Sequence, residues 1–289
     1  MISYLCVLSV YVLLGMCGQN SFAQAGLWGV GSYITANVMM KLGFPTLIAF
    51  AASTLGTALF AFVLGFAFFR LRQYYFTFAS VGLMAILSGL FMNWKEVTGG
   101  AMGISDVPDF SIGGFIANTE SSMYFVIIIV CVIVSLLMKV LFKSALGRSF
   151  MAIRDNEMAA NCLGVNSLLT KSIAFAISGA LCGAAGALYA NLTGYLSYQS
   201  FTYQQSTMYL VMIMLGGTVS PVGAIIGTFI ISLLQEWVRP LQNYMQLIYG
   251  VGIMILMIVQ PEGIIGGGKA LYERYVNRKQ ARSDIKQSL

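Results

Sequence analysis

Charged side chains that could carry out chemistry gather in one short stretch, residues 146–164, with the sequence LGRSFMAIRDNEMAANCLG. We call this stretch the polar segment. Its charged residues are Arg148, Arg154, Asp155 and Glu157, and small residues lie between them. Because long apolar runs flank it on both sides, the polar segment is predicted to be a rigid, helical contact for a soluble partner, in which the charges set specificity.

Residue types that support catalysis or metal binding are scarce. The sequence has no histidine, which excludes His-based acid–base catalysis, His-containing nucleophilic triads and His-ligated metals. The cysteines show no CxxC pairing, and we interpret them as small hydrophobic residues packed within helices. They are Cys6, Cys17, Cys131, Cys162 and Cys182. No metal site is predicted.

A membrane-embedded enzyme is one alternative, and it would need paired carboxylates or a nucleophile with its base near an interface. Asp106 and Asp109 are the only close acidic pair in the loop at 93–122. A proline and glycines lie beside them, as is typical of a solvated turn. The sequence therefore favours a non-enzymatic role, and no catalytic residue is assigned.

Residues 263–270, GIIGGGKA, match GxxxxGK, the first part of a nucleotide-binding P-loop. Ala270 stands where a Ser or Thr would ligate magnesium, and the stretch follows an apolar run rather than a strand of an α/β domain. We interpret it as a flexible, glycine-rich exit from the membrane with Lys269 at the headgroups. No cofactor is predicted in this chain, so any ATP and magnesium would be bound by another chain.

Composition places the chain in the membrane. Of its 289 residues 58% are hydrophobic and 9% are charged, whereas an average soluble domain has about 25% charged residues. Runs of about 20 apolar residues predict transmembrane helices. These runs lie at 2–17, 24–41, 44–69, 74–92, 123–142 and 169–191, with three more in 204–260. The predicted fold is all-α, a polytopic bundle of eight or nine transmembrane helices.

The distribution of basic residues predicts the orientation. One side collects 13 of the 16 Lys and Arg residues, including those of a loop at about 143–168 and a tail at about 261–289. The loop at about 93–122 falls on the opposite side and is acidic. The positive-inside rule makes the basic side and the C-terminus cytoplasmic and the 93–122 loop periplasmic. No basic residue precedes the first apolar run, so a signal peptide is not expected.

Glycines indicate close helix contacts or a pathway for a solute. Gly179 and Gly183 form a GxxxG pair, and Gly223 and Gly227 form another. In lipid such pairs let helix backbones approach closely, but the same glycines could leave room for a solute. The glycines for which both roles stay open are Gly29, Gly31, Gly179, Gly183, Gly216 and Gly217.

An ion-coupled secondary carrier is a second alternative. Such carriers usually hold carboxylates near the middle of the membrane. Here Lys41, Lys139 and Glu236 lie at or near the ends of predicted spans, and the spans are otherwise almost free of charge. The driving energy is therefore expected to come from elsewhere.

Several blocks of sequence resemble one transporter family. GRSFMAIRDNEMAANCLGVN, followed by Lys171 and AFAISGALCGAAGALYA, resembles the cytoplasmic loop and next helix of the branched-chain amino acid ABC permeases, of the high-affinity leucine/isoleucine/valine M-subunit type. GQNSFAQAGLWGVGSY at 18–33, NWKEVTGGAMGISDVP at 93–108, MLGGTVSPVGAIIG at 214–227 and QPEGIIG at 260–266 resemble further blocks of the family. Gln24 departs from the pattern, since many relatives have His there.

The resemblance implies that residues 1–289 form one permease domain of an ATP-driven importer in the bacterial inner membrane. Its partners would be a related second permease subunit, two cytoplasmic ABC ATPase subunits and a periplasmic binding protein, with no nucleic acid. A coupling helix at 149–164 would dock on an ATPase. Small residues would allow close approach there and charged ones would fix the register. These residues are Arg148, Arg154, Asp155, Glu157, Ala159, Ala160 and Gly164.

The resemblance also implies the cargo, a branched-chain amino acid, while relatives of the same pattern carry urea or short amides. An apolar amino acid needs an apolar pathway with polar groups or helix ends for its ammonium and carboxylate. Hydroxyl groups in the predicted spans that could serve are those of Ser32, Tyr33, Thr35 and Thr77.

Overall fold

The computed structural model describes residues 1–70, 73–108, 110–112, 115–116, 120–218, 220–238 and 250. The chain divides into two compact units, Met1–Leu210 and Val211–Leu289. The P-loop-like stretch, the basic tail and the last of the three runs predicted within 204–260 therefore lie outside the described residues, as do Arg72 and Asp109.

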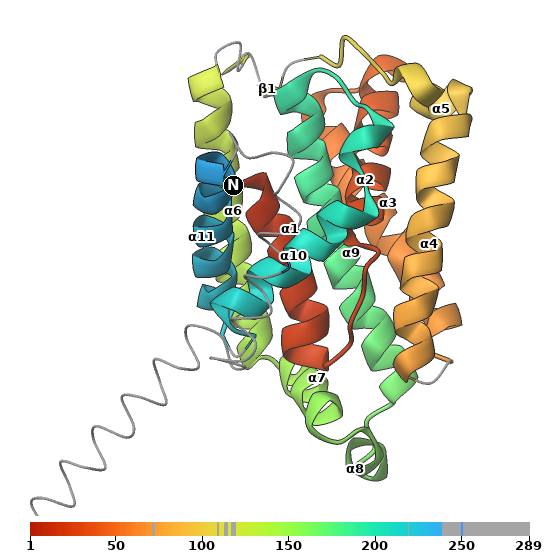
Figure 1. Ribbon diagram of the computed structural model, residues 1–289, viewed down its shortest axis with the longest axis vertical. Helices are drawn as coiled ribbons and strands as arrows, with labels where there is room; N and C mark the ends of the chain where they lie inside the picture. Colours follow the sequence, from red (N-terminus) through yellow and green to blue (C-terminus); the bar gives the residue numbers. More distant parts are fainter. Residues whose placement is uncertain are drawn as a thin grey trace, which may run out of the picture. The chain divides into compact units, whose positions relative to one another are not determined.

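Helices make up most of the described chain (Figure 1). The first part contains α1 (Ile2–Val10), the π-helix η1 (Tyr11–Met16), α2 (Gln24–Met40), α3 (Thr46–Phe68), α4 (Gln73–Asn93), α5 (Lys95–Thr98) and the 3-10 helix η2 (Gly100–Met102). A short antiparallel pair, β1 (Ser111–Ile112) and β2 (Phe115–Ile116), follows. The remaining elements are α6 (Glu120–Lys143), α7 (Ala145–Asp155), α8 (Glu157–Cys162), α9 (Ser167–Thr193), the 3-10 helix η3 (Tyr198–Ser200), α10 (Tyr203–Gly216) and α11 (Pro221–Val238).

Each described apolar run coincides with a helix, and the all-α class is confirmed. Four helices, α3, α4, α6 and α9, are long and apolar enough to cross a membrane, and α10 with α11 would add a fifth if the pair is one span. The apolar helix at Ile2–Met16, formed by α1 and η1, is shorter. The total of eight or nine spans stays a prediction.

The centre of the first unit is α9, which packs against α1, α2 and α3. Within its most apolar 18 residues 72% are buried, against 11% for α6. The hydroxyl of Ser53 on α3 lies 2.8 Å from the carbonyl oxygens of both Gly31 on α2 and Gly183 on α9, and shares its one proton between them. This junction joins the three helices at a point where glycines let their backbones approach closely.

The loops at the two ends of the first unit are distinct in position and contacts (Figure 1). α7 and α8 lie at one end of the bundle, and α5 and β1 lie at the other. At the second end, Ile104 and Leu196 exchange both backbone hydrogen bonds, so the loop after α5 is tied to the loop after α9. The predicted opposition of the 93–122 and 143–168 loops agrees with this arrangement.

In the second unit, the end of α10 and the start of α11 approach closely through glycines. A Cβ atom on Gly227 would lie 1.7 Å from the Met212 carbonyl oxygen, and one on Gly216 would lie 1.9 Å from the Gly223 carbonyl oxygen. Gly217 has φ +108° in the turn between the two helices, a conformation that side chains disfavour. The glycines here permit a tight turn and a close helix contact.

Candidate functional site: the polar segment and its contacts

The polar segment forms two helices rather than the single helix predicted for 149–164. Asn156 interrupts it with extended backbone at φ −160° and ψ 106°, and its Oδ1 accepts a hydrogen bond from the Ala159 N–H. Asn is among the best helix N-caps because its side chain satisfies a free N–H of the first turn. It therefore ends α7 and begins α8.

Side-chain caps also fix the helices on either side of this break. Ser144 Oγ accepts from the Gly147 N–H at the start of α7, and Asn166 Oδ1 accepts from the Leu169 N–H at the start of α9. Gly147 is needed for the sharp passage from α6 to α7, because a Cβ there would lie 2.3 Å from the Leu141 carbonyl oxygen. The direction of each helix in this region is thus set locally.

Arg154 fastens α7 to the first helix of the chain. Its Nη1 donates to the carbonyl oxygen of Gly15 in η1. A Cβ atom on Gly18 would lie 3.3 Å from the Arg154 Cγ atom, so the aliphatic part of the arginine side chain packs closely against the backbone at that glycine. Within the chain this side chain therefore contacts η1, and the partner contact that the resemblance implies for Arg154 stays a prediction.

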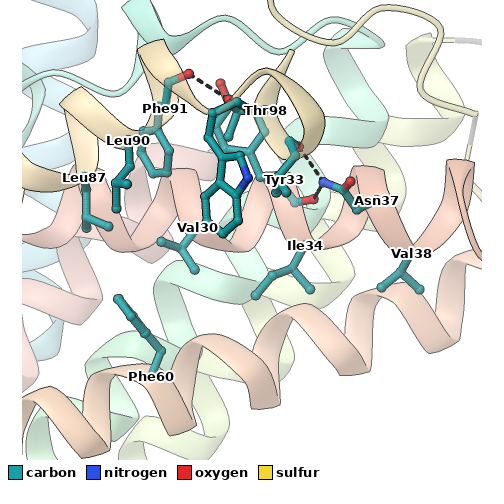
Figure 2. Close-up of a pocket in the computed structure, with 12 residues that line it drawn as sticks. Val30, Tyr33, Ile34, Asn37, Val38, Phe60, Leu87, Leu90, Phe91 and Thr98 are labelled. Carbon is teal, nitrogen blue, oxygen red and sulfur yellow. Dashed lines mark hydrogen bonds between the residues drawn. The ribbon is translucent and has the colours of Figure 1, made fainter. Parts of the chain in front are cut away.

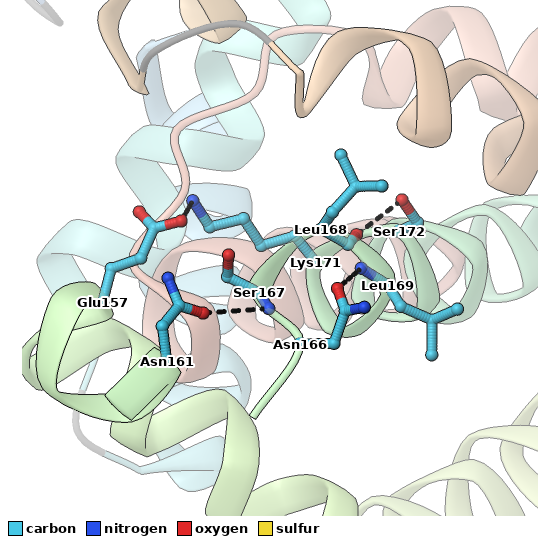
Figure 3. Close-up of polar contacts among 8 residues, drawn as sticks. All are labelled: Glu157, Asn161, Asn166, Ser167, Leu168, Leu169, Lys171 and Ser172. Carbon is cyan, nitrogen blue, oxygen red and sulfur yellow. Dashed lines mark hydrogen bonds and ion pairs between the residues drawn. The ribbon is translucent and has the colours of Figure 1, made fainter. Parts of the chain in front are cut away.

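Glu157 fastens α8 to α9 (Figure 3). Its Oε1 lies 2.6 Å from Nζ of Lys171, and the Lys171 side chain is only 6% exposed whereas that of Glu157 is 41% exposed. A buried ammonium group needs a partner because leaving water is costly for an isolated charge. Glu157 therefore supplies the countercharge for a lysine inside the bundle.

Other residues of the polar segment face outward. Arg148, Asp155 and Ala159 are exposed, and Arg148 Nη1 donates to the nearby Lys143 carbonyl oxygen. Gly164 is also exposed and has φ +87°. Ala160, by contrast, is buried.

Two large apolar side chains at the tip of the polar segment were not assigned from the sequence. Met158 is 77% exposed and Leu163 is 85% exposed. Scattered apolar residues are common on protein surfaces, but both of these belong to α8 and the residue after it, in a segment that internal bonds hold in place. Because methionine and leucine occur throughout an apolar sequence, only the three-dimensional fold distinguishes these two.

The glycines predicted to pack or to line a pathway lie at close contacts. A Cβ on Gly179 would lie 2.5 Å from Ala61 Cβ, and one on Gly183 would lie 2.6 Å from the Ser53 carbonyl oxygen. A Cβ on Gly31 would lie 2.6 Å from Gly183 Cα. Gly29 lies against the rings of Phe91 and Phe201.

A cavity of about 370 Å³ lies among α2, α3, α4 and α5 (Figure 2). Two of its polar side chains bond to backbone: Asn37 Nδ2 donates to the Tyr33 and Val97 carbonyl oxygens, and Thr98 Oγ1 donates to that of Phe91. The remaining wall is aliphatic and aromatic, including Val30, Phe60 and Leu90. This cavity suits an apolar group and offers little to a charged one.

The hydroxyl groups considered for the cargo are mostly engaged elsewhere. Ser32 and Thr35 donate to the Trp28 and Gly31 carbonyl oxygens of their own helix, and Thr77 donates to that of Asn20. The Tyr33 hydroxyl is buried without a partner. Asp106, from the acidic pair, is exposed at φ +61° and accepts from the Ser105 hydroxyl.

Comparison with known proteins agrees with this architecture. The family described as "Branched-chain amino acid transport system / permease component" matches residues 1–259. The high-affinity branched-chain amino acid transport system permease protein LivM of Salmonella typhimurium is 30% identical over 284 residues, covering 89% of this chain and 66% of LivM. LivM of Escherichia coli K12 gives the same identity and coverage. The chain thus spans just under two thirds of the length of these curated relatives.

A more distant relative is named for another cargo. The autoinducer 2 import system permease protein LsrC of Salmonella paratyphi B is 23% identical over 240 residues, covering 79% of this chain and 66% of LsrC. No solved structure matches the chain. The family match covers most of the chain, and the helices that it covers are long and apolar enough for several membrane crossings. The resemblance predicted from the sequence is confirmed: the chain is a multi-pass membrane permease that belongs to the branched-chain amino acid transport system permease family.

Proposed function

We propose that this chain is the membrane-spanning permease subunit of an ATP-driven importer of branched-chain amino acids in the bacterial inner membrane. The 30% identity to LivM over most of the chain supports the cargo. The excess of Lys and Arg on one side supports a periplasmic 93–122 loop and a cytoplasmic polar segment and C-terminus.

The complete importer would contain four further subunits. A related second permease subunit would complete the pathway, two cytoplasmic ATPase subunits would bind ATP and magnesium, and a periplasmic binding protein would deliver the amino acid. This chain would be the single permease domain and would hydrolyse nothing itself.

The observation that supports the proposal most is how the polar segment is attached to the bundle and which side chains it exposes. Arg154 and Glu157 fasten it to the bundle, while Met158 and Leu163 extend from its tip. We assign α7 and α8 together as the coupling element that contacts an ATPase subunit. The apolar tip would enter a groove on the partner, and Asp155 would lie at its rim. Firm attachment is required because a loose loop would not pass movement from one subunit to the other.

Replacing the tip with charge tests this assignment. We expect Met158→Asp with Leu163→Asp to reduce co-purification of the ATPase subunits at least tenfold, because each change places a carboxylate in an apolar contact. Membrane insertion and elution on size exclusion should stay normal, since both side chains are exposed. Met102→Asp is the matched control, because Met102 is 86% exposed in η2. Full ATPase binding by the double variant would refute the coupling assignment.

Uptake by reconstituted vesicles tests the cargo and the energy source. Import should require ATP, the periplasmic binding protein, the second permease subunit and the ATPase subunits. Leucine, isoleucine and valine should compete with one another for uptake. The relation to LsrC favours autoinducer 2 as a second candidate cargo. It should be tested as a competitor of leucine uptake together with aromatic amino acids, urea and short amides. Uptake driven by an ion gradient alone would instead support a secondary carrier.

A further inference from the structure

One face of α2 is open to the outside of the bundle at the cavity of Figure 2. Residues 24–39 of this helix are buried, apart from four that are partly exposed. These four are Val30, Ile34, Asn37 and Val38. Steps of three and four residues place them on one face of the helix, and all four line the cavity. The cavity is therefore where α2 can be reached from outside.

Two long apolar helices form the sides of this cavity, which we call the apolar groove. Phe60 lines it from α3, whereas Leu90 of α4 and the following Trp94 line it from the other side. Leu90 is 43% exposed and Trp94 is 50% exposed, so the groove is open rather than enclosed. Because α3 and α4 are both long and apolar enough to cross a membrane, the groove lies at the depth of the lipid chains.

The apolar groove matches a lipid acyl chain in length and in chemistry. Val30, the lining residue farthest from the end of α2, lies ten positions before Met40, which is about 15 Å at 1.5 Å per residue. The hydrocarbon core of a bilayer is about 30 Å thick, so each leaflet contributes about 15 Å. The wall of the groove is almost entirely apolar, and its Asn37 and Thr98 side chains already bond to backbone.

Basic side chains lie where the groove reaches the end of α2. Nζ of Lys41, the residue after this helix, donates to the Glu96 carbonyl oxygen on α5. Trp94 and Val97, on either side of this contact, line the groove. Lys41 and Lys95 are both exposed, and an ammonium group has three donors, so Lys41 can bind a further acceptor. Tryptophan and lysine are typical of the membrane interface, where lipid phosphates lie.

We propose that the apolar groove holds one acyl chain of a bilayer phospholipid, whose phosphate binds Lys41 and Lys95. The chain lies along the open face of α2 and fills the space between α3 and α4. The two ammonium groups outnumber the neighbouring carboxylate of Glu96, so the mouth of the groove complements a phosphate. This lipid site requires only that the chain is a membrane protein, and it does not depend on the cargo.

Photoreactive lipids test this site in the full chain reconstituted into vesicles, with and without the second permease subunit. Two forms of phosphatidylethanolamine carry a diazirine in one acyl chain, either near its methyl end or near its ester. The methyl-end probe should label Val30 and the ester-end probe should label Val38, because the chain enters along the helix axis. Peptide mass spectrometry locates the labels. Ile129, which is 57% exposed on α6, reports ordinary contact with lipid.

Labelling of Ile129 without labelling of Val30 and Val38 would overturn the proposal. Loss of the Val30 and Val38 labels when the second permease subunit is added would also overturn it, because the groove would then be filled by that subunit.

Filling the groove tests the acyl-chain contact. Leu90→Trp places an indole at the open side, and labelling of Val30 should fall about tenfold because the chain and the indole compete for the same space. Leu55→Trp is the matched control, since Leu55 is 69% exposed on α3 and does not line the groove. Equal labelling of Val30 in the two variants would overturn the acyl-chain site.

Removing the lysines tests the phosphate contact without changing the groove. Lys41→Gln with Lys95→Gln should reduce labelling of Val30 about fivefold, as expected for two exposed ion pairs. Lys139→Gln with Lys143→Gln makes the same change at exposed positions of α6 and should leave the labelling at its unsubstituted level. Unchanged labelling in the Lys41 and Lys95 double variant would overturn the phosphate contact.

Discussion

Replacing Gly183 with leucine is expected to prevent the folded bundle from forming. Even a single Cβ there would lie 2.6 Å from the Ser53 carbonyl oxygen and 3.0 Å from Thr54 Cα, so the obstacle is backbone that no rotamer change removes. Widening the contact would also break the Ser53 hydrogen bonds to α2 and α9. We expect a loss of about 3–5 kcal/mol, at the upper end for overpacking.

Gly82→Leu makes the same chemical change where space is open, because no atom lies within 4 Å of a Cβ on Gly82. Its effect should stay within about 0.5 kcal/mol. Size-exclusion chromatography after a heating series would compare the two proteins. If Gly183→Leu stayed monodisperse to the same temperature as Gly82→Leu, the close α3–α9 contact would be wrong.

Glu157→Gln is expected to loosen α8 from α9 and to uncouple the polar segment from the bundle. The change leaves the ammonium group of Lys171 inside the protein without a countercharge. Removing one partner of a buried pair costs about 3–5 kcal/mol, and the partial exposure of Glu157 should bring the loss to about 2–3 kcal/mol. Transport should fall with stability, because the segment would no longer be held at this point.

A double variant distinguishes two causes of the lost stability: the loss of the attraction between Glu157 and Lys171, and the burial of an unpaired Lys171 charge. Lys171→Met combined with Glu157→Gln removes both charges, and most of the stability should return because an apolar side chain suits the buried position. Asp155→Asn is the matched control, since Asp155 is an exposed acid on the same segment. The measurement is the melting temperature of the unsubstituted protein, Glu157→Gln, the double variant and Asp155→Asn. Equal melting temperatures for Glu157→Gln and Asp155→Asn would contradict a structural role for the ion pair.

The sequence predicted the helices well because the bilayer imposes a simple rule on length and composition. The run at 24–41 corresponds to α2 at Gln24–Met40, and the run at 169–191 corresponds to α9 at Ser167–Thr193. Such runs are read locally, from the transfer of apolar side chains into lipid. The same rule placed the polar segment outside the bundle.

The contacts of the polar segment were predicted less well, since they depend on residues far apart along the chain. Arg154 meets Gly15, which lies 139 positions earlier, and Glu157 meets Lys171, 14 positions later. Charges on a polar segment look alike in sequence whether they face a partner or their own chain. The break at Asn156 had a local signal, an N-cap residue followed by Glu, but the run of helix-favouring residues around it obscured that signal.

The Ser53 junction limits how this permease can move. One hydroxyl joins α2, α3 and α9, and glycine contacts leave no room for these helices to slide past one another. They are expected to travel as one rigid body during alternating access. The relative displacement needed for alternating access would then fall to the helices around this block, with α6, the least buried of the four long helices, free to shift against lipid.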